Sequence, residues 1–239
     1  MKFKLIGCQV FMRELYMLAA HSPHSVHIRW MPTDLHTQPQ RDLRPALQAE
    51  IDKIEQETDG CDAILLGYGL CSMGTAGLKS RSIPLIIPRA HDCITILLGS
   101  REKYQEIFEK YSGGVYWYSP GWIEQFKTPG RGYDEQAKYM EYVEKYGEEN
   151  AEYLIEVEKS WMQHYSCAAL IQWPSMKEER FEAITRGIAE KQNLEYILAE
   201  GEETMLRKLV YGEWDENFLR VEPGQSIVYS SDERLLIAE

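Results

Sequence analysis

The alternation of short apolar runs with amphipathic segments in the first 111 residues constrains the fold more than any other feature of this sequence. Strands are expected at 2–7, 26–31, 63–66 and 84–87, and helices at 12–20, 41–57, 92–98 and 101–111. Within 41–57, for example, Leu43, Leu47 and Ile51 recur every fourth residue, as on one face of a helix. Strand–helix–strand alternation is typical of a parallel sheet covered by helices, so we predict an α/β fold.

The second half continues the alternation after the pair Gly113-Gly114, which we take as a boundary. Strands are expected at 115–118, 168–172, 194–198 and 218–221, helices at 134–146, 148–164, 177–191 and 202–209, and a loop at 124–133. The tail segments 226–228 and 235–238 would add edge structure. We therefore predict two Rossmann-like α/β halves, 1–112 and 113–239. One continuous doubly wound sheet is the alternative.

Composition and charge exclude several classes of protein. With 44% hydrophobic and 27% charged residues the chain is an ordinary globular protein, and no apolar run approaches the ~20 residues of a membrane helix. Residues 1–120 are neutral overall, and residues 121–239 carry the whole net charge of −12. The absence of a basic stripe argues against nucleic-acid and membrane partners. The acidic half is expected to be a solvated helix face, or else a docking surface for a basic partner.

The N-terminus lacks the apolar core of a signal peptide, so we expect a cytoplasmic protein.

The cysteines are the main candidates for chemistry. There are five, an odd number that argues against a disulfide framework in a reducing compartment. Ligands of open α/β sheets bind beyond the carboxyl ends of the strands, and Cys8, Cys71 and Cys93 each follow the end of a different predicted strand. Converging thiolates are typical of a site for zinc, iron, cobalt or an iron–sulfur cluster. The alternative is a set of buried thiols that line a pocket.

The sequence His91-Asp92-Cys93 is the densest part of this predicted site. We expect Asp92 to cap a helix that begins at Cys93, whose N-terminus would lower the pKa of that thiol. His91 would be a fourth metal ligand or an acid–base group.

Further residues at the same predicted edge could bind a ligand. Loop glycines allow a backbone to approach a ligand closely, although their spacing matches neither of the common nucleotide-binding patterns. The candidate ligand-binding residues are Gly67, Gly69, Ser72, Arg89, Trp122 and Glu124. A turn without a ligand is the alternative for the glycines, and a rigid turn with Trp122 in the core is the alternative for the last two.

Another set of candidates falls at the opposite edge, where helices lead back into strands. Its members are His21, His24, Cys61, His164 and Cys167. We expect these to be structural, with the cysteines acting as small buried hydrophobic residues.

Several segments together resemble a known family. They are 7–8, 13–15, 35–36, 43–48, 67–75 (Gly-Tyr-Gly-Leu-Cys-Ser-Met-Gly-Thr), 88–95, 98–101 and 120–124. The chain resembles the DUF1638 family, a domain of unknown function in anaerobic bacteria and methanogens. Members are often encoded near corrinoid-dependent methyltransferases, so the resemblance implies a setting in one-carbon metabolism and such a methyltransferase system as a partner. It implies no catalytic residues.

The leading hypothesis is therefore a cytoplasmic metal-binding protein of anaerobic corrinoid or methyl-group metabolism. Cys8, Cys71 and Cys93 would be the ligands, with His91 beside them and Glu124 as a supporting carboxylate. Whether it is an enzyme is left open. One alternative is a two-lobed protein that binds a small molecule, and another is a metal-free enzyme with Cys71 or Cys93 as nucleophile.

Overall fold

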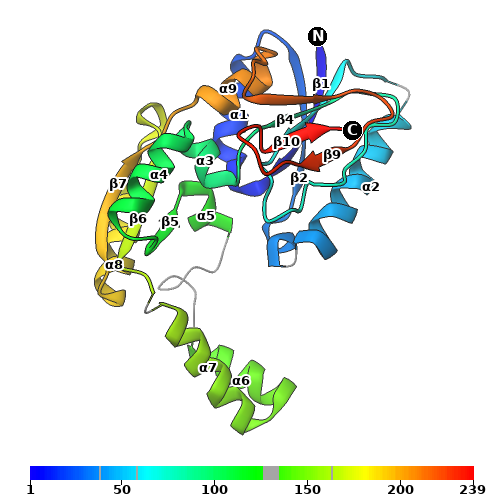
Figure 1. Ribbon diagram of the computed structural model, residues 1–239. Coiled ribbons are helices and arrows are strands. Elements are labelled where there is room, and N and C mark those ends of the chain that lie inside the picture. Colours follow the sequence, from blue (N-terminus) through cyan, green and yellow to red (C-terminus); the bar gives the residue numbers. More distant parts are fainter. Residues whose placement is uncertain (38, 58, 126–134, 163) are drawn as a thin grey trace. The chain divides into compact units, whose positions relative to one another are not determined.

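The computed structural model describes residues 1–239 except 38, 58, 126–134 and 163 (Figure 1). Contacts divide the chain into two compact units, unit 1 with Met1–Lys103 and Gly201–Glu239, and unit 2 with Tyr104–Glu200. The fold is α/β with mostly parallel sheets flanked by helices, which confirms the predicted class. Among the described residues, no helix combines the length and the apolar character that a membrane span requires.

Unit 1 contains a five-stranded sheet in the order β2-β1-β3-β4-β8. The strands are β1 (Lys2–Cys8), β2 (Ser25–Met31), β3 (Ala63–Gly67), β4 (Leu85–Pro88) and β8 (Phe218–Val221). The first four are parallel to their neighbours, and β8 runs antiparallel to β4. Strands β3 and β4 are buried along their whole length, as continuous apolar runs predict for a sheet covered on both faces.

The helices of unit 1 cover both faces of this sheet. Helix α1 (Met12–His21) leads from β1 to β2, and α2 (Arg44–Glu55) leads back from β2 past β1 to β3. Because both crossovers are expected to be right-handed and they run in opposite directions, the two helices lie on opposite faces. Helix α9 (Thr204–Tyr211) packs beside α1 and against α3 (Cys93–Leu98). Figure 1 shows α1 and α9 on one side of the sheet and α2 on the other.

The C-terminal segment returns to unit 1, so the structure divides the chain differently from the predicted ranges 1–112 and 113–239. Strand β8 completes the sheet, and β9 (Ile227–Tyr229) and β10 (Leu236–Ala238) form an antiparallel pair. The Arg89 guanidinium also donates to the carbonyls of Arg234 (2.8 Å) and Leu236. Pairing between residues more than 120 positions apart leaves no local signal, which is why the glycine pair at 113–114 gave a different boundary.

Unit 2 is built on a second parallel sheet in the order β5-β6-β7. Its strands are β5 (Val115–Tyr118), β6 (Cys167–Gln172) and β7 (Glu195–Glu200). Its helices are α5 (Pro120–Gln125), α6 (Glu135–Tyr146), α7 (Glu148–Met162) and α8 (Glu179–Gln192). Helix α4 (Arg101–Lys110) begins in unit 1 and ends in unit 2. Its main hydrophobic cluster packs Phe181 of α8 against Tyr118 and Leu170 of the sheet.

Most predicted elements of unit 2 are present, with one difference after β5. Helix α5 occupies residues 120–125, so it includes the first two residues of the expected loop 124–133. Residues 126–133 of that loop lie outside the described residues. Proline at the first helical position explains the early start, because its missing N–H is not needed in the first turn.

A buried lysine is held by carboxylates on unit 1. Lys4 of β1 is only 3% exposed and forms ion pairs with Glu57 and Asp59, which follow α2. Glu57 also pairs with Arg29 of β2. Hydrogen bonds from Lys4 and Arg29 lower the pKa of Glu57. For Lys4, burial acts to lower the pKa, but the hydrogen bonds to Asp59 and Glu57 outweigh it and the pKa is raised.

We expect Glu57→Gln to cost about 1 kcal/mol at neutral pH, because the pair is partly exposed and screened. The unfolded chain binds a proton at Glu57 more readily than the folded one. The contribution is therefore present above the ordinary pKa of 4.5 and is lost as the pH falls through the lower folded value. Urea unfolding of both proteins at pH 7 and pH 4 checks this, because their difference in stability should shrink at pH 4. An equal difference at both pH values would contradict it.

Candidate functional site

The three candidate thiols lie at the carboxyl ends of three adjacent strands of unit 1. Cys8 is the last residue of β1, Cys71 lies four residues after β3, and Cys93 follows β4 as the first residue of α3. Cys8 and Cys71 are buried, and Cys93 keeps partial exposure. Because β1, β3 and β4 are neighbours in the sheet, their ends bring the three loops together.

Burial raises the pKa values of all three thiols. Burial raises the pKa of Cys8 to about 11, although the Val10 backbone and the nearby Tyr68 hydroxyl act to lower it. Burial and the charge of Cys8 raise the pKa of Cys71 to about 12. Burial, the Asp92 carboxylate and the other two thiols raise the pKa of Cys93 well above its usual value. The three groups are therefore protonated at neutral pH in the protein alone.

Tyr68 is the first residue after β3, and its hydroxyl interacts electrostatically with the three thiols. It is 1% exposed, and burial together with the charges of Cys8, Cys71 and Cys93 raises the pKa of its hydroxyl. The hydroxyl lies near enough to the Cys8 thiol to affect it, but it makes no hydrogen bond of normal geometry with any described residue. A buried hydroxyl without a hydrogen-bond partner costs free energy of folding, so this position lacks a polar group that could pair with it.

The loops after β3 and β4 are joined through their backbones. The Leu70 N–H donates to the Ala90 carbonyl (2.8 Å), and the Cys71 N–H donates to the His91 carbonyl (2.9 Å). A side chain at Gly69 would place its Cβ 2.6 Å from the Ala90 carbonyl oxygen. Only glycine allows this close approach, so Gly69 fixes the spacing of the loops that carry Cys71 and Cys93.

The backbone at Cys71 is strained. Cys71, Ser72 and Met73 have φ angles of 48°, 52° and 68°, a left-handed run of three residues that all carry a Cβ. Each such residue costs on the order of 1–2 kcal/mol. Around the turn, the Thr75 hydroxyl donates to the Gly69 carbonyl (3.0 Å) and Arg44 donates to the Met73 carbonyl (2.7 Å). Strain held by surrounding contacts is typical of functional sites.

The predicted helix cap is confirmed, whereas its predicted effect on Cys93 is wrong. The Asp92 carboxylate accepts hydrogen bonds from the Thr95 N–H (2.9 Å) and hydroxyl (3.0 Å) at the start of α3. The pKa of Cys93 is nevertheless raised, because burial and the negative charge of Asp92 itself oppose ionisation of the thiol.

The other predicted site residues of unit 1 have varied surroundings. His91 and Ser72 are exposed, and His91 contacts the Cys71 loop through its backbone carbonyl. Gly67 ends β3 opposite Gly7 of β1. The Arg89 side chain is engaged with backbone carbonyls of the C-terminal segment.

Trp122 and Glu124 belong to unit 2. Trp122 packs against the cluster around Phe181, and its backbone N–H donates to the Ser119 hydroxyl (3.1 Å). Glu124 accepts a hydrogen bond from Arg180 (3.0 Å).

Cys61 and Cys167 lie at the starts of strands rather than at their carboxyl ends. Cys61 precedes β3 and is half-buried, and Cys167 begins β6 in the core of unit 2. Both pKa values are raised by burial, that of Cys167 to about 11.

A metal site is not preformed. Within the part of the chain that the structure describes, no group of three His, Cys, Asp or Glu side chains is arranged to hold one metal ion. Neutral thiols have no electrostatic reason to converge on one point. Metal binding would therefore require the cysteine side chains to rotate from their present positions.

His36 and Tyr68 were not among the predicted site residues. Their rings stack at a centroid distance of 6.0 Å with 16° between the planes. The sequence contained a signal for each residue. His36 follows β2 and so lies at the carboxyl edge of the sheet, and Tyr68 stands between two loop glycines.

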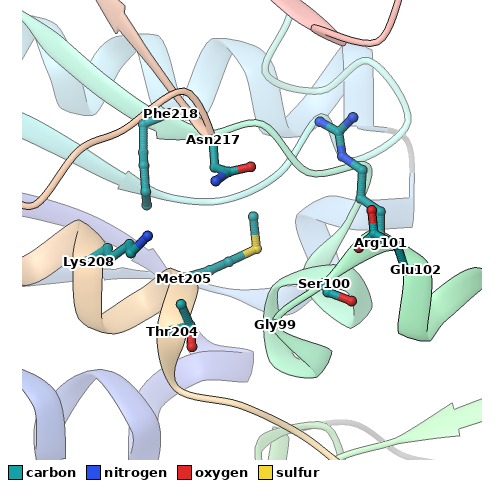
Figure 2. Close-up of a pocket in the computed structure, with 9 residues that line it drawn as sticks. All are labelled: Gly99, Ser100, Arg101, Glu102, Thr204, Met205, Lys208, Asn217 and Phe218. Atoms are coloured by element: carbon teal, nitrogen blue, oxygen red, sulfur yellow. The ribbon is translucent and has the colours of Figure 1, made fainter.

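A separate pocket of about 230 Å³ opens at the C-terminal end of α3, whereas Cys93 lies at its N-terminal end. In Figure 2, the Met205 sulfur and the Asn217 amide point toward its centre. Lys208 in its wall is ion-paired with Asp215, and Arg101 donates to the carbonyls of Arg89 and Glu233. The pocket is therefore polar without a strong net charge.

One family model matches the chain. It is DUF1638, described as a protein of unknown function, and it covers residues 30–210. No curated protein and no solved structure matches.

Proposed function

Because the chain belongs to the DUF1638 family, whose function is unknown, we propose a function from the site itself: the protein binds a soft metal through Cys8, Cys71 and Cys93. The metal is a single ion of zinc, iron or cobalt, or an iron–sulfur cluster, since all of these take thiolate ligands.

The convergence of three thiols from three strand ends carries this proposal. Their pKa values rise because each additional negative charge in this buried place is unfavourable. A bound cation reverses that balance, since ligand thiols lose their protons on binding. The Tyr68 hydroxyl without a normal hydrogen bond and the strained turn at Cys71 support the same conclusion, because both are costs that a ligand can offset.

The alternative of a metal-free cysteine nucleophile finds less support. Nucleophilic cysteines react as thiolates and have lowered pKa values. Here burial raises the pKa of both Cys71 and Cys93, so neither is ionised at neutral pH.

The setting we propose is the cytoplasm and corrinoid-linked methyl-group metabolism, in keeping with the family resemblance. A thiolate-bound metal supplies a Lewis acid or holds structure. Cys8, Cys71 and Cys93 would orient it, and burial would limit the access of water.

The test is the metal-to-protein ratio of protein purified without oxygen. We expect wild type to hold a stoichiometric metal, and Cys8→Ala, Cys71→Ala and Cys93→Ala to lose most of it because each removes one ligand. The controls are Cys61→Ala and Cys167→Ala, which should keep the metal and cost about 1–2 kcal/mol as small core truncations.

A wild type without metal, or three variants that all keep it, would overturn the proposal. The second candidate, binding of a small polar molecule, would then be favoured by the pocket beside α3. Loss of metal from Cys167→Ala would also contradict the assignment of the ligands.

A further inference from the structure

The pocket beside α3 lies at the carboxyl end of strand β4 in unit 1. Strand β8 runs antiparallel to β4, so its first residue, Phe218, pairs with Pro88, the last residue of β4. The Arg89 N–H also donates to the Asn217 carbonyl (2.7 Å). Because Phe218 and Asn217 both line the pocket, it belongs to the edge of the sheet at which α/β folds bind ligands.

The charged side chains that line this pocket favour a negatively charged ligand. They are Lys208, Arg101 and Glu102, two positive groups and one negative. The pKa of Glu102 is lowered by its own backbone N–H and by the nearby Ser100 hydroxyl, so this carboxylate already has local partners at the start of α4. Asp215, which pairs with Lys208, is not one of the lining residues. The positive charge of Lys208 therefore faces the pocket while its counter-charge stands behind it.

Lys208 can bind an anion and keep its ion pair. An ammonium group has three N–H donors, and among the described residues only the Asp215 carboxylate accepts from Lys208. The hydrogen bond from Lys208 is the main cause that lowers the pKa of Asp215, and Asn217 contributes, so Asp215 stays ionised and holds both residues in place. In Figure 2, the Lys208 ammonium and the Asn217 amide are directed toward the same space. Both can therefore donate to one acceptor group.

Apolar side chains complete the wall of the pocket. Met205 is 7% exposed and Phe218 is 6% exposed, and both line the pocket with Lys208 (Figure 2). A thioether is a weak acceptor and a phenyl ring has no polar group, so this part of the wall suits a hydrocarbon. The volume of about 230 Å³ is below the roughly 300–1,000 Å³ of typical ligand pockets, so the ligand is small.

We propose that this pocket binds a small monocarboxylate with a short hydrocarbon chain. The carboxylate accepts hydrogen bonds from Lys208 and Asn217, and the chain contacts Met205 and Phe218. This inference goes beyond the proposed metal binding and does not depend on it, because the pocket and Cys93 lie at opposite ends of α3.

The experiment is a ligand-observed NMR titration of the full chain at constant ionic strength. The probes are butyrate, acetate and 1-butanol, and each titration gives a dissociation constant. We expect butyrate to bind roughly 10-fold more tightly than 1-butanol, because hydrogen bonds to a charged group are stronger. Butyrate should also bind about 10-fold more tightly than acetate, because each buried methylene contributes about fourfold.

Two variants that break the same ion pair should have opposite effects on butyrate. Lys208→Gln is expected to weaken its binding about 10-fold and to leave 1-butanol unchanged. Asp215→Asn should strengthen it about 3-fold, because a nearby negative charge is lost while the amide oxygen can still accept from the Asn217 N–H (2.9 Å). Lys53→Gln is the matched control, since it removes a lysine that pairs with Glu50 on α2, and it should match wild type. Circular dichroism checks that each variant is folded.

Weaker butyrate binding in both Lys208→Gln and Asp215→Asn would overturn the proposal, because the ion pair would then only shape the pocket. No binding of butyrate, equal binding of butyrate and 1-butanol, or weaker binding in Lys53→Gln would overturn it as well. Failure of the metal proposal is distinguishable, because it is measured as the metal-to-protein ratio of the thiol variants. Lys208→Gln should leave that ratio at the wild-type value.

Discussion

Replacing Gly69 by alanine is expected to lower the free energy of unfolding by about 3 kcal/mol, as a severe case of overpacking. The new Cβ would lie 2.6 Å from the Ala90 carbonyl oxygen and 2.9 Å from the Asp92 backbone nitrogen. These are backbone atoms of a loop that is hydrogen-bonded to the Gly69 loop, so neither side can move away without breaking those bonds. The displacement would also separate Cys71 from Cys93, and metal binding should be lost with it.

Gly187→Ala is the matched control. Gly187 lies inside α8, and a Cβ there meets no atom within 4 Å. Alanine is a better helix former, so this variant should be more stable than wild type by about 0.5–1 kcal/mol. Urea unfolding of the three proteins measures both effects. A Gly69→Ala protein as stable as wild type would show that the loops after β3 and β4 are farther apart than described.

Phe181→Ala is expected to cost about 3–5 kcal/mol, the usual range for removing a buried aromatic ring. Phe181 is 1% exposed and packs with Tyr118, Leu170 and Ile188 in the main cluster of unit 2. Its loss leaves a cavity between α8 and the sheet β5-β6-β7. The measurement is thermal and urea unfolding of the variant.

The control at this position is Phe181→Leu, which keeps most of the apolar volume and should cost less than about 1.5 kcal/mol. The thiols belong to unit 1, so folded Phe181→Ala should keep its metal-to-protein ratio. Equal stability of the alanine and leucine variants would contradict the packing of Phe181, and loss of metal would show that unit 2 supports the site.

Local patterns predicted the elements of this fold well. Apolar runs such as 63–66 became the buried strand β3, and Leu47 and Ile51 lie on the inner side of α2, with Leu43 as its N-cap residue. Both follow from interactions between residues near in sequence, which periodicity reports directly. The same reasoning placed Cys8, Cys71 and Cys93 at one edge, because parallel strands in neighbouring positions end at the same side of the sheet.

Sequence patterns did not predict which groups surround each side chain. The Asp92 cap follows from residue types, but the raised pKa of Cys93 depends on burial and on the charges that tertiary packing brings near it. His91 is next to Asp92 in sequence and is exposed, whereas His36 is more than 30 residues from Tyr68 and stacks on it. Closeness in sequence therefore does not report which side chains pack together.

The α/β class, the positions of most strands and helices, and the edge of the sheet at which the thiols lie could be predicted from sequence patterns. The pairing of β8 with β4, the insertion of unit 2 between two parts of unit 1, and the stacking of Tyr68 on His36 could not. The difference lies in the range of the interactions. Hydrophobic periodicity is local, whereas strand pairing, burial and the energy of a buried charge depend on residues that come together only when the chain folds.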